Sequence, residues 1–220
     1  MNSFALRKTP SRRLLKSSLL ATTLFVVNFS VIAVSQEPGK ETSNEQKLSA
    51  QKIDSLASLT NLQTNNDFMY SSGLPAKTHL SLLKNQGVSH VVDLIPGDRS
   101  QEIVSASEIG LTYFNVPVDW EKPALADFLN YAAFMQGVDQ KSDKVLTHCK
   151  LNWRGASFTY LYRVNVLGED EAIAKKDLLS IWQPNPTWYQ FMDNVIAHYN
   201  AINDTQVAMS FDAYIPEPSS

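Results

Sequence analysis

Short segments rich in β-branched and aromatic residues alternate with helical windows through most of this 220-residue chain, and this alternation constrains the fold more than any other feature. The predicted strands are residues 67–71, 88–95, 111–118 and 144–148, and the predicted helices are residues 78–85, 125–137, 155–165, 169–182 and 187–201. Strands that alternate with helices form parallel sheets covered on both faces. The sequence therefore predicts an α/β fold with three layers, in which helices flank a mainly parallel sheet of four to five strands.

The first 35 residues differ in character from the rest of the chain. They carry five basic residues and no acidic residue, followed by an apolar run at 19–34 that closes with Ala33, Val34 and Ser35. This order is typical of a secretory signal peptide, and the run is shorter than the ~20 apolar residues that span a bilayer. We expect an exported, periplasmic protein, with an uncleaved N-terminal membrane anchor as the alternative. The predicted organisation is a signal peptide at 1–35, a polar linker with a short helix at 36–62, an α/β domain at 63–203 and a C-terminal tail at 204–220.

The charge of the chain excludes several classes of partner. Removal of the leader leaves 14 basic against 22 acidic residues, a net charge of −8. A net negative domain without a basic stripe is a poor ligand for nucleic acid or for an anionic membrane surface. We therefore expect no nucleic-acid partner, and membrane contact only through an uncleaved signal. Any bound anion must be held by a local site.

Such a site is predicted around Cys149, the single cysteine of the chain. The predicted strand 144–148 runs directly into Cys149, and a helix follows after a short loop that contains Arg154. Ligands of α/β sheets bind at the carboxyl ends of the strands, where this loop falls. Backbone amides and a helix N-terminus attract an oxyanion and favour the thiolate form of a cysteine, and the Arg154 fork matches two oxygens of a phosphate. The alternative interpretation is a small, buried and unreactive cysteine.

His148 and Cys149 followed by Arg154 on a strand–loop–helix segment resemble the signature of the cysteine-dependent tyrosine and dual-specificity phosphatases. More narrowly, they resemble bacterial phosphatase-like proteins of the beta-lactamase-hydrolase-like group. The resemblance covers about residues 67–200 and includes the segments 72–75, 87–94 and 115–118. It implies a dual-specificity-phosphatase-like fold and hydrolysis of a phosphate monoester, on a phosphorylated small molecule or a phosphoprotein, without a cofactor.

The same resemblance implies a role for each residue of the loop. Cys149 would accept the phosphoryl group, and Arg154 with the amides of residues 150–154 would hold its oxygens. Asp119 would be the general acid, with Glu121 as the reserve choice and Trp120 helping to close their loop. His148 would tune the sulfur from behind. The remaining residues predicted to contact the substrate are Lys150, Leu151, Asn152, Trp153, Gly155 and Ser157.

The spacing of the loop departs from the phosphatase pattern and leaves two alternatives open. Four residues separate Cys149 from Arg154, whereas phosphatases of this kind have five. A six-residue ring resembles that of rhodanese-type sulfurtransferases, which would carry a persulfide on Cys149. A shortened loop also suits a catalytically inactive module that only binds oxyanions. The scattered histidines show no metal-ligand spacing, so no metal site is predicted.

Overall fold

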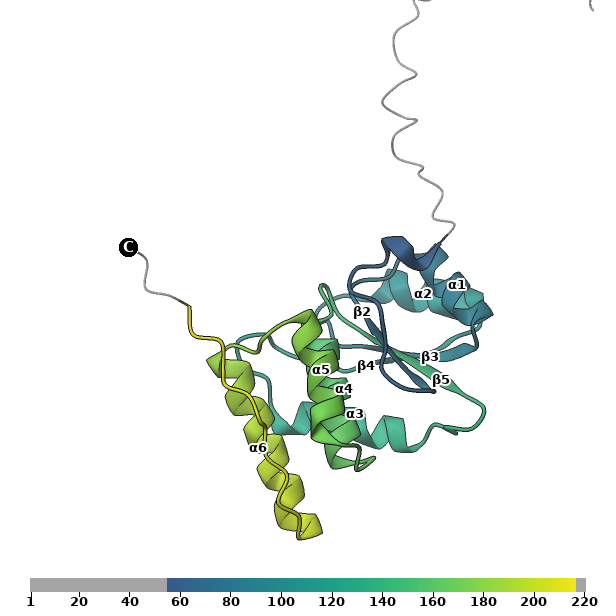
Figure 1. Ribbon diagram of the computed structural model, residues 1–220. Helices are drawn as coiled ribbons and strands as arrows, with labels where there is room; N and C mark the ends of the chain where they lie inside the picture. Colours follow the sequence, from purple (N-terminus) through teal and green to yellow (C-terminus); the bar gives the residue numbers. More distant parts are fainter. Residues whose placement is uncertain (1–54, 217–220) are drawn as a thin grey trace, which may run out of the picture. The chain divides into compact units, whose positions relative to one another are not determined.

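A five-stranded sheet runs through residues 55–216, the part of the chain that the computed structural model describes (Figure 1). Its strands are β1 (Gln63–Thr64), β2 (Met69–Ser72), β3 (Val88–Asp93), β4 (Thr112–Asn115) and β5 (Lys144–His148), and their order across the sheet is β1-β2-β5-β3-β4. Every neighbouring pair is parallel except β1 with β2. This confirms the predicted α/β class and the mainly parallel sheet.

Helices cover both faces of the sheet (Figure 1). On one face lie α1 (Lys77–Asn85) and α2 (Ser100–Ile109). On the other lie α3 (Leu125–Gln136), α4 (Trp153–Asn165), α5 (Glu171–Ile181) and α6 (Pro186–Asn203). A short 3-10 turn at Leu56–Ser58 precedes β1.

The two faces of the sheet belong to two separate hydrophobic clusters. Val91 of β3 and Leu146 of β5 pack with α1 and α2, whereas their chain neighbours Val92 and Val145 pack with α3 to α6. Successive side chains of a strand point to opposite faces, so a run of consecutive apolar residues fills both clusters. This burial on both faces fixes β5, and with it the position of Cys149, in the interior of the sheet.

Several element boundaries differ from those predicted. Helix α2 was not predicted, because only Ala106 is buried in it while Ile103 and Val104 are about half exposed, so it has no apolar periodicity. The strand predicted at 111–118 is paired only over Thr112–Asn115. Strand β1 has two polar residues and gives no strand pattern. The short helix predicted within 36–62 is reduced, within the described residues, to the 3-10 turn.

The C-terminal segment after α6 packs back onto the domain. The side chains of Val207, Met209 and Phe211 lie partly buried against the larger cluster, and the Tyr214 amide donates to the Pro184 carbonyl at 2.8 Å. The sequence predicted only a tail with little structural signal here. The predicted signal peptide lies outside the described residues. Among residues 55–216, no helix has the length and apolar character needed to span a bilayer.

Candidate active site

The loop that follows β5 lies where three parallel strands end. Strand β5 is paired with β2 on one side and β3 on the other. The Cys149 amide donates to the Ser72 carbonyl at 3.2 Å, and the Lys150 carbonyl accepts from the Leu74 amide at 3.2 Å. These bonds fix the start of the loop to the end of β2. Cys149 therefore sits at the carboxyl edge of the sheet, the place at which α/β proteins bind ligands.

The turn into α4 depends on Asn152 and Gly155. Asn152 has a φ of 68°, a left-handed conformation that asparagine tolerates better than most residues. Its buried side chain donates to the Asn61 carbonyl at 2.7 Å and to the Ser71 hydroxyl at 3.1 Å, which ties the loop to the strands. A Cβ atom on Gly155 would stand 2.4 Å from Asn152 Oδ1, so only glycine allows the chain to turn this closely.

The first turn of α4 directs unpaired backbone donors toward the loop. The first backbone hydrogen bond at the start of α4 runs from the Ala156 amide to the Asn152 carbonyl, at 2.8 Å. The amides before Ala156 therefore have no partner within the helix, as at every helix N-terminus. Such amides, with the positive end of the helix dipole, stabilise an oxyanion.

A pocket of about 340 Å³ opens over the loop. Cys149, which is 1% exposed, lies in it together with the half-buried Arg154. The other lining residues are Ile95, Pro96, Trp120, Lys150, Leu151 and Trp153. A recessed cysteine, an arginine that lines the same pocket and mainly apolar walls form a site that can hold an oxyanion carried on an organic group.

The structure brings together six of the residues predicted from the sequence, because Trp120, Cys149, Lys150, Leu151, Trp153 and Arg154 all line this pocket. Ile95 and Pro96, which follow β3, were not predicted, and their only signal was that they end a neighbouring strand. Among the other predicted residues, Ser157 donates its hydroxyl to the Trp153 carbonyl at 3.0 Å. Asn152 and Gly155 shape the turn beneath the pocket.

Asp119 lies in the loop 116–124, between β4 and α3. Its side chain is exposed, and its Oδ1 accepts from the Glu121 amide at 2.9 Å. The residues on either side of Asp119 reach the pocket. The Val118 carbonyl accepts from Arg154 Nε at 3.1 Å, and Trp120 lines the pocket wall. Asp119 is thus carried on a loop that contacts the site, with its own carboxylate on the solvent side.

His148 points away from this pocket into a buried cluster of charged residues. Its Nε2 lies 2.8 Å from Glu102 Oε1 and 3.8 Å from Asp93 Oδ1. The Arg99 guanidinium contacts both carboxylates, and the Tyr113 hydroxyl donates to Asp93 at 2.6 Å. Burial opposes the charge of Arg99, but the hydrogen bond to Asp93 and the charges of both carboxylates raise its pKa. The pKa of Tyr113 is also raised, mainly by burial and to a smaller extent by the contact with Asp93.

This cluster was not apparent from the sequence, because its members come from β3, α2, β4 and β5. Ligand atoms of Asp93, Glu102 and His148 lie within 4.8 Å of one another, a spacing compatible with a cation. The Arg99 guanidinium already supplies a positive charge to both carboxylates. The arrangement is therefore a largely buried network in which the Arg99 guanidinium and two carboxylates surround His148, the residue before Cys149.

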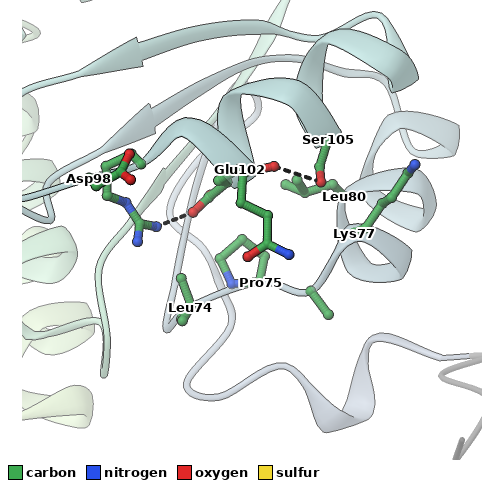
Figure 2. A pocket seen from close by; sticks show the side chains of 10 residues that line it. Leu74, Pro75, Lys77, Leu80, Asp98, Glu102 and Ser105 are labelled. Carbon is green, nitrogen blue, oxygen red and sulfur yellow. Dashed lines mark hydrogen bonds and ion pairs between the residues drawn. The ribbon is translucent and has the colours of Figure 1, made fainter.

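The outer side of the same network lines a second pocket, of about 320 Å³, between α1 and α2 (Figure 2). Figure 2 shows Leu74 and Pro75 on one side of it, Lys77 and Leu80 of α1, and Asp98, Glu102 and Ser105 from the α2 side. Its lining carries charges of both signs, so it has no clear preference for anions or cations. Leu74 connects this pocket to the Cys149 loop through the bond to the Lys150 carbonyl.

Several solved structures share this fold. A protein from Shewanella putrefaciens CN-32, provisionally described as a phosphatase (DUF442), is 30% identical with a TM-score of 0.58, over 67% of this chain and 98% of that chain. TpbA from P. aeruginosa is 21% identical with a TM-score of 0.52, over 66% and 91%. The catalytic core of the PP-IP phosphatase SIW14 from S. cerevisiae is 14% identical with a TM-score of 0.53, over 66% and 94%. No family model and no curated protein matches the chain.

The five-stranded sheet and its flanking helices share their fold with TpbA and SIW14, which agrees with the dual-specificity-phosphatase-like fold that the resemblance in the sequence implied. More narrowly, the chain belongs to the DUF442 family, because it covers almost the whole of the Shewanella protein at 30% identity.

Proposed function

We propose that this domain hydrolyses a phosphate monoester through a cysteinyl-phosphate intermediate on Cys149. The observation that supports the proposal best is the pocket itself, which the buried Cys149 and the half-buried Arg154 both line and whose loop leads directly into the N-terminus of α4. A phosphoryl group in this pocket would have its phosphorus next to the sulfur and its oxygens next to the guanidinium and the helix amides. The description of the Shewanella relative as a phosphatase agrees with this proposal.

The proposed reaction has two steps. The Cys149 sulfur attacks phosphorus, the bond from phosphorus to the ester oxygen breaks, and Asp119 donates a proton to the departing oxygen. Water then attacks the cysteinyl phosphate, Asp119 takes a proton from that water, and phosphate leaves with regeneration of the thiolate. Arg154 and the amides of the loop stabilise the charge on the phosphoryl oxygens in both steps.

The walls of the pocket suggest the kind of substrate. Most of the wall is apolar or aromatic, and it consists of Ile95, Pro96, Leu151, Trp120 and Trp153. The organic group next to the phosphate would therefore contact mainly uncharged side chains. One structure of the related TpbA holds phosphotyrosine, and SIW14 is named for its action on PP-IP. We propose a phosphorylated small molecule or a phosphoprotein as the substrate.

Asp119→Asn is expected to slow hydrolysis in a manner that depends on the leaving group. General acid catalysis contributes roughly 10²–10⁴-fold when the departing oxygen is a poor leaving group. The variant should therefore lose about this factor in kcat with an alkyl phosphate, and much less with p-nitrophenyl phosphate, whose phenolate leaves without a proton. Steady-state kinetics on both substrates measure the difference. Equal losses on the two substrates would show that Asp119 is not the general acid. Glu121→Gln, which changes the reserve candidate in the same loop, is the matched control.

The short spacing between Cys149 and Arg154 supports a second candidate function, that of a sulfurtransferase. The Cys149 thiolate would then take the outer sulfur of thiosulfate as a persulfide, with release of sulfite, and cyanide would remove that sulfur as thiocyanate and regenerate the thiolate. Parallel assays of the wild-type protein and Cys149→Ser on an aryl phosphate and on thiosulfate distinguish the two reactions. If inorganic phosphate binds to the protein but no phosphate ester is hydrolysed, this result would instead favour a module that only binds oxyanions. The likeness of segments 72–75, 87–94 and 115–118 also leads us to propose the beta-lactamase-hydrolase-like branch for this chain.

We further propose that the domain works after export, in the periplasm. The basic, apolar and small-residue order of residues 1–35 supports this location. Expression of the full chain in a Gram-negative host should yield a periplasmic protein whose N-terminus is Gln36. Deletion of residues 2–35 should retain the protein in the cytoplasm. A full-length protein recovered from the cytoplasmic fraction with Met1 in place would contradict the proposal.

A further inference from the structure

The four tryptophans of the chain meet at one place beside the pocket, although they come from four different segments. Trp120 is in the loop 116–124, Trp153 begins α4, Trp182 follows α5 and Trp188 is in α6. The Trp120 ring lies 5.5 Å from Trp153, 5.4 Å from Trp182 and 5.1 Å from Trp188, centroid to centroid. Trp120 therefore contacts each of the other three, as Trp182 also does, and of these two only Trp120 lines the pocket among the described residues.

The backbone on both sides of Asp119 is anchored by this arrangement. Before it, the Val118 carbonyl accepts from Arg154 Nε at 3.1 Å, and the Val118 side chain is fully buried. After it, the Trp120 carbonyl accepts from Trp188 Nε1 at 3.0 Å. A loop fixed at both neighbours of Asp119 has little freedom to move away from the pocket.

The same indole contacts the guanidinium of Arg154. The Cζ atom of Arg154 lies 5.3 Å from the Trp120 ring centroid, within the range of a cation–π interaction. The guanidinium lies over the indole ring, and its Nε is bonded to the Val118 carbonyl. The two terminal amino groups are then left to bind two oxygens of a phosphate side by side.

We infer that Trp120 is a positioning residue, which holds the Arg154 guanidinium in place and keeps the backbone of the Asp119 loop against the pocket before a substrate binds. This inference rests on the proposed function, because it assigns the geometry of that same site. The indole has two effects. Its face restricts rotation of the guanidinium, and its packing among Trp153, Trp182 and Trp188 anchors the loop to α4, α5 and α6.

Replacement of Trp120 tests the inference. Trp120→Leu keeps an apolar side chain but removes the π face, so it should weaken the binding of inorganic phosphate by about tenfold. It should lower kcat/KM for p-nitrophenyl phosphate by about 100-fold, the loss expected when a reacting group is displaced by about an ångström. Trp120→Phe retains an aromatic face and should recover most of both quantities. Isothermal calorimetry and steady-state kinetics give the values.

Trp182→Leu is the matched control. Trp182 packs against Trp120 and stacks on Trp153 at 5.4 Å, but no contact links it to Arg154 and it does not line the pocket, within the described residues. It should lower the melting temperature as Trp120→Leu does, and leave phosphate affinity unchanged. Unaltered phosphate affinity in Trp120→Leu, or an equal loss in Trp182→Leu, would overturn the inference.

The wild-type protein supplies a second test that does not depend on the folding of a variant. Because the loop is already seated, hydrogen exchange of the amides of residues 118–121 should be nearly the same with and without saturating phosphate. Strong protection that appears only when phosphate binds would overturn the inference. The proposed function would still stand in that case, as long as the wild-type protein binds phosphate and hydrolyses the ester. A wild-type protein that neither binds phosphate nor hydrolyses an ester would remove the proposed function and this inference together.

Discussion

Cys149→Ser is expected to abolish hydrolysis of p-nitrophenyl phosphate, with a fall in kcat of at least about 10⁴-fold, the scale seen when a catalytic nucleophile is removed. Serine is nearly the same size as cysteine, and the side chain is 1% exposed, so the substitution should fit without rearrangement. The hydroxyl, however, is a far weaker nucleophile in this position because no carboxylate or imidazole is among the described residues that line the pocket, so none is placed to remove its proton. Single-turnover and steady-state assays of the purified proteins measure the loss.

Phosphate binding is the control for this substitution. Arg154 and the amides of the loop remain in Cys149→Ser, so inorganic phosphate should bind the variant about as well as it binds the wild-type protein. Loss of binding would show that the loop had been damaged rather than the chemistry. Undiminished turnover in a variant that binds phosphate would rule out Cys149 as the nucleophile.

Arg154→Lys is expected to lower kcat/KM for the same ester by about 10²–10³-fold, the loss typical of removing one preorganised donor to the transition-state charge. Lysine keeps the charge but lacks the planar fork that binds two oxygens at once. It also cannot reproduce both the Nε bond to the Val118 carbonyl and the flat contact with Trp120. Steady-state kinetics on the aryl ester should show the loss mainly in kcat. Calorimetry should show a smaller loss in the affinity for phosphate.

Lys150→Gln is the comparison for the arginine. Lys150 is the other cation that lines the pocket, and its side chain is exposed. An exposed charge is screened by solvent, so its removal should cost less than about tenfold. If Lys150→Gln were as damaging as Arg154→Lys, general positive charge rather than the arginine fork would be responsible for binding, and the assigned role of Arg154 would be wrong.

Much of the fold could be predicted because its central strands bury both faces. The consecutive β-branched and aliphatic residues of β3 and β5 indicate buried strands, and the proline before α3 and the glycine after it mark a helix. Helix α2 could not be found in this way, since its apolar residues Ile103 and Val104 face solvent. Its identity as a helix depends on packing against α1 and β4, which the local sequence does not encode.

The same limit applies to the candidate site. Cys149 and Arg154 are five positions apart on one strand–loop–helix segment, so the sequence alone places both of them at the pocket. Residues that meet from distant segments cannot be found by spacing. Ile95 reaches the pocket because β3 is the neighbour of β5, and Glu102 reaches His148 because α2 packs beneath that edge. Only the order of the strands places these residues together.

The local sequence also concealed how the loop with Asp119 is held. Trp120 suggested a residue that helps to close the loop, but its partners Trp182 and Trp188 lie more than 60 positions away in the chain. Their convergence depends on α5 and α6 packing against α4. An aromatic cluster of this kind gives the Arg154 guanidinium a fixed face without using another charged residue.

The central claim is that the phosphoryl group passes through the Cys149 sulfur, and rapid-quench mass spectrometry of the wild-type protein during turnover of p-nitrophenyl phosphate tests it most directly. The account predicts a burst of p-nitrophenol and, in the quenched protein, a mass increment of one phosphoryl group on the peptide that contains Cys149. Release of phosphate at the wild-type rate with that peptide unmodified at every time point, and without a burst, would contradict it.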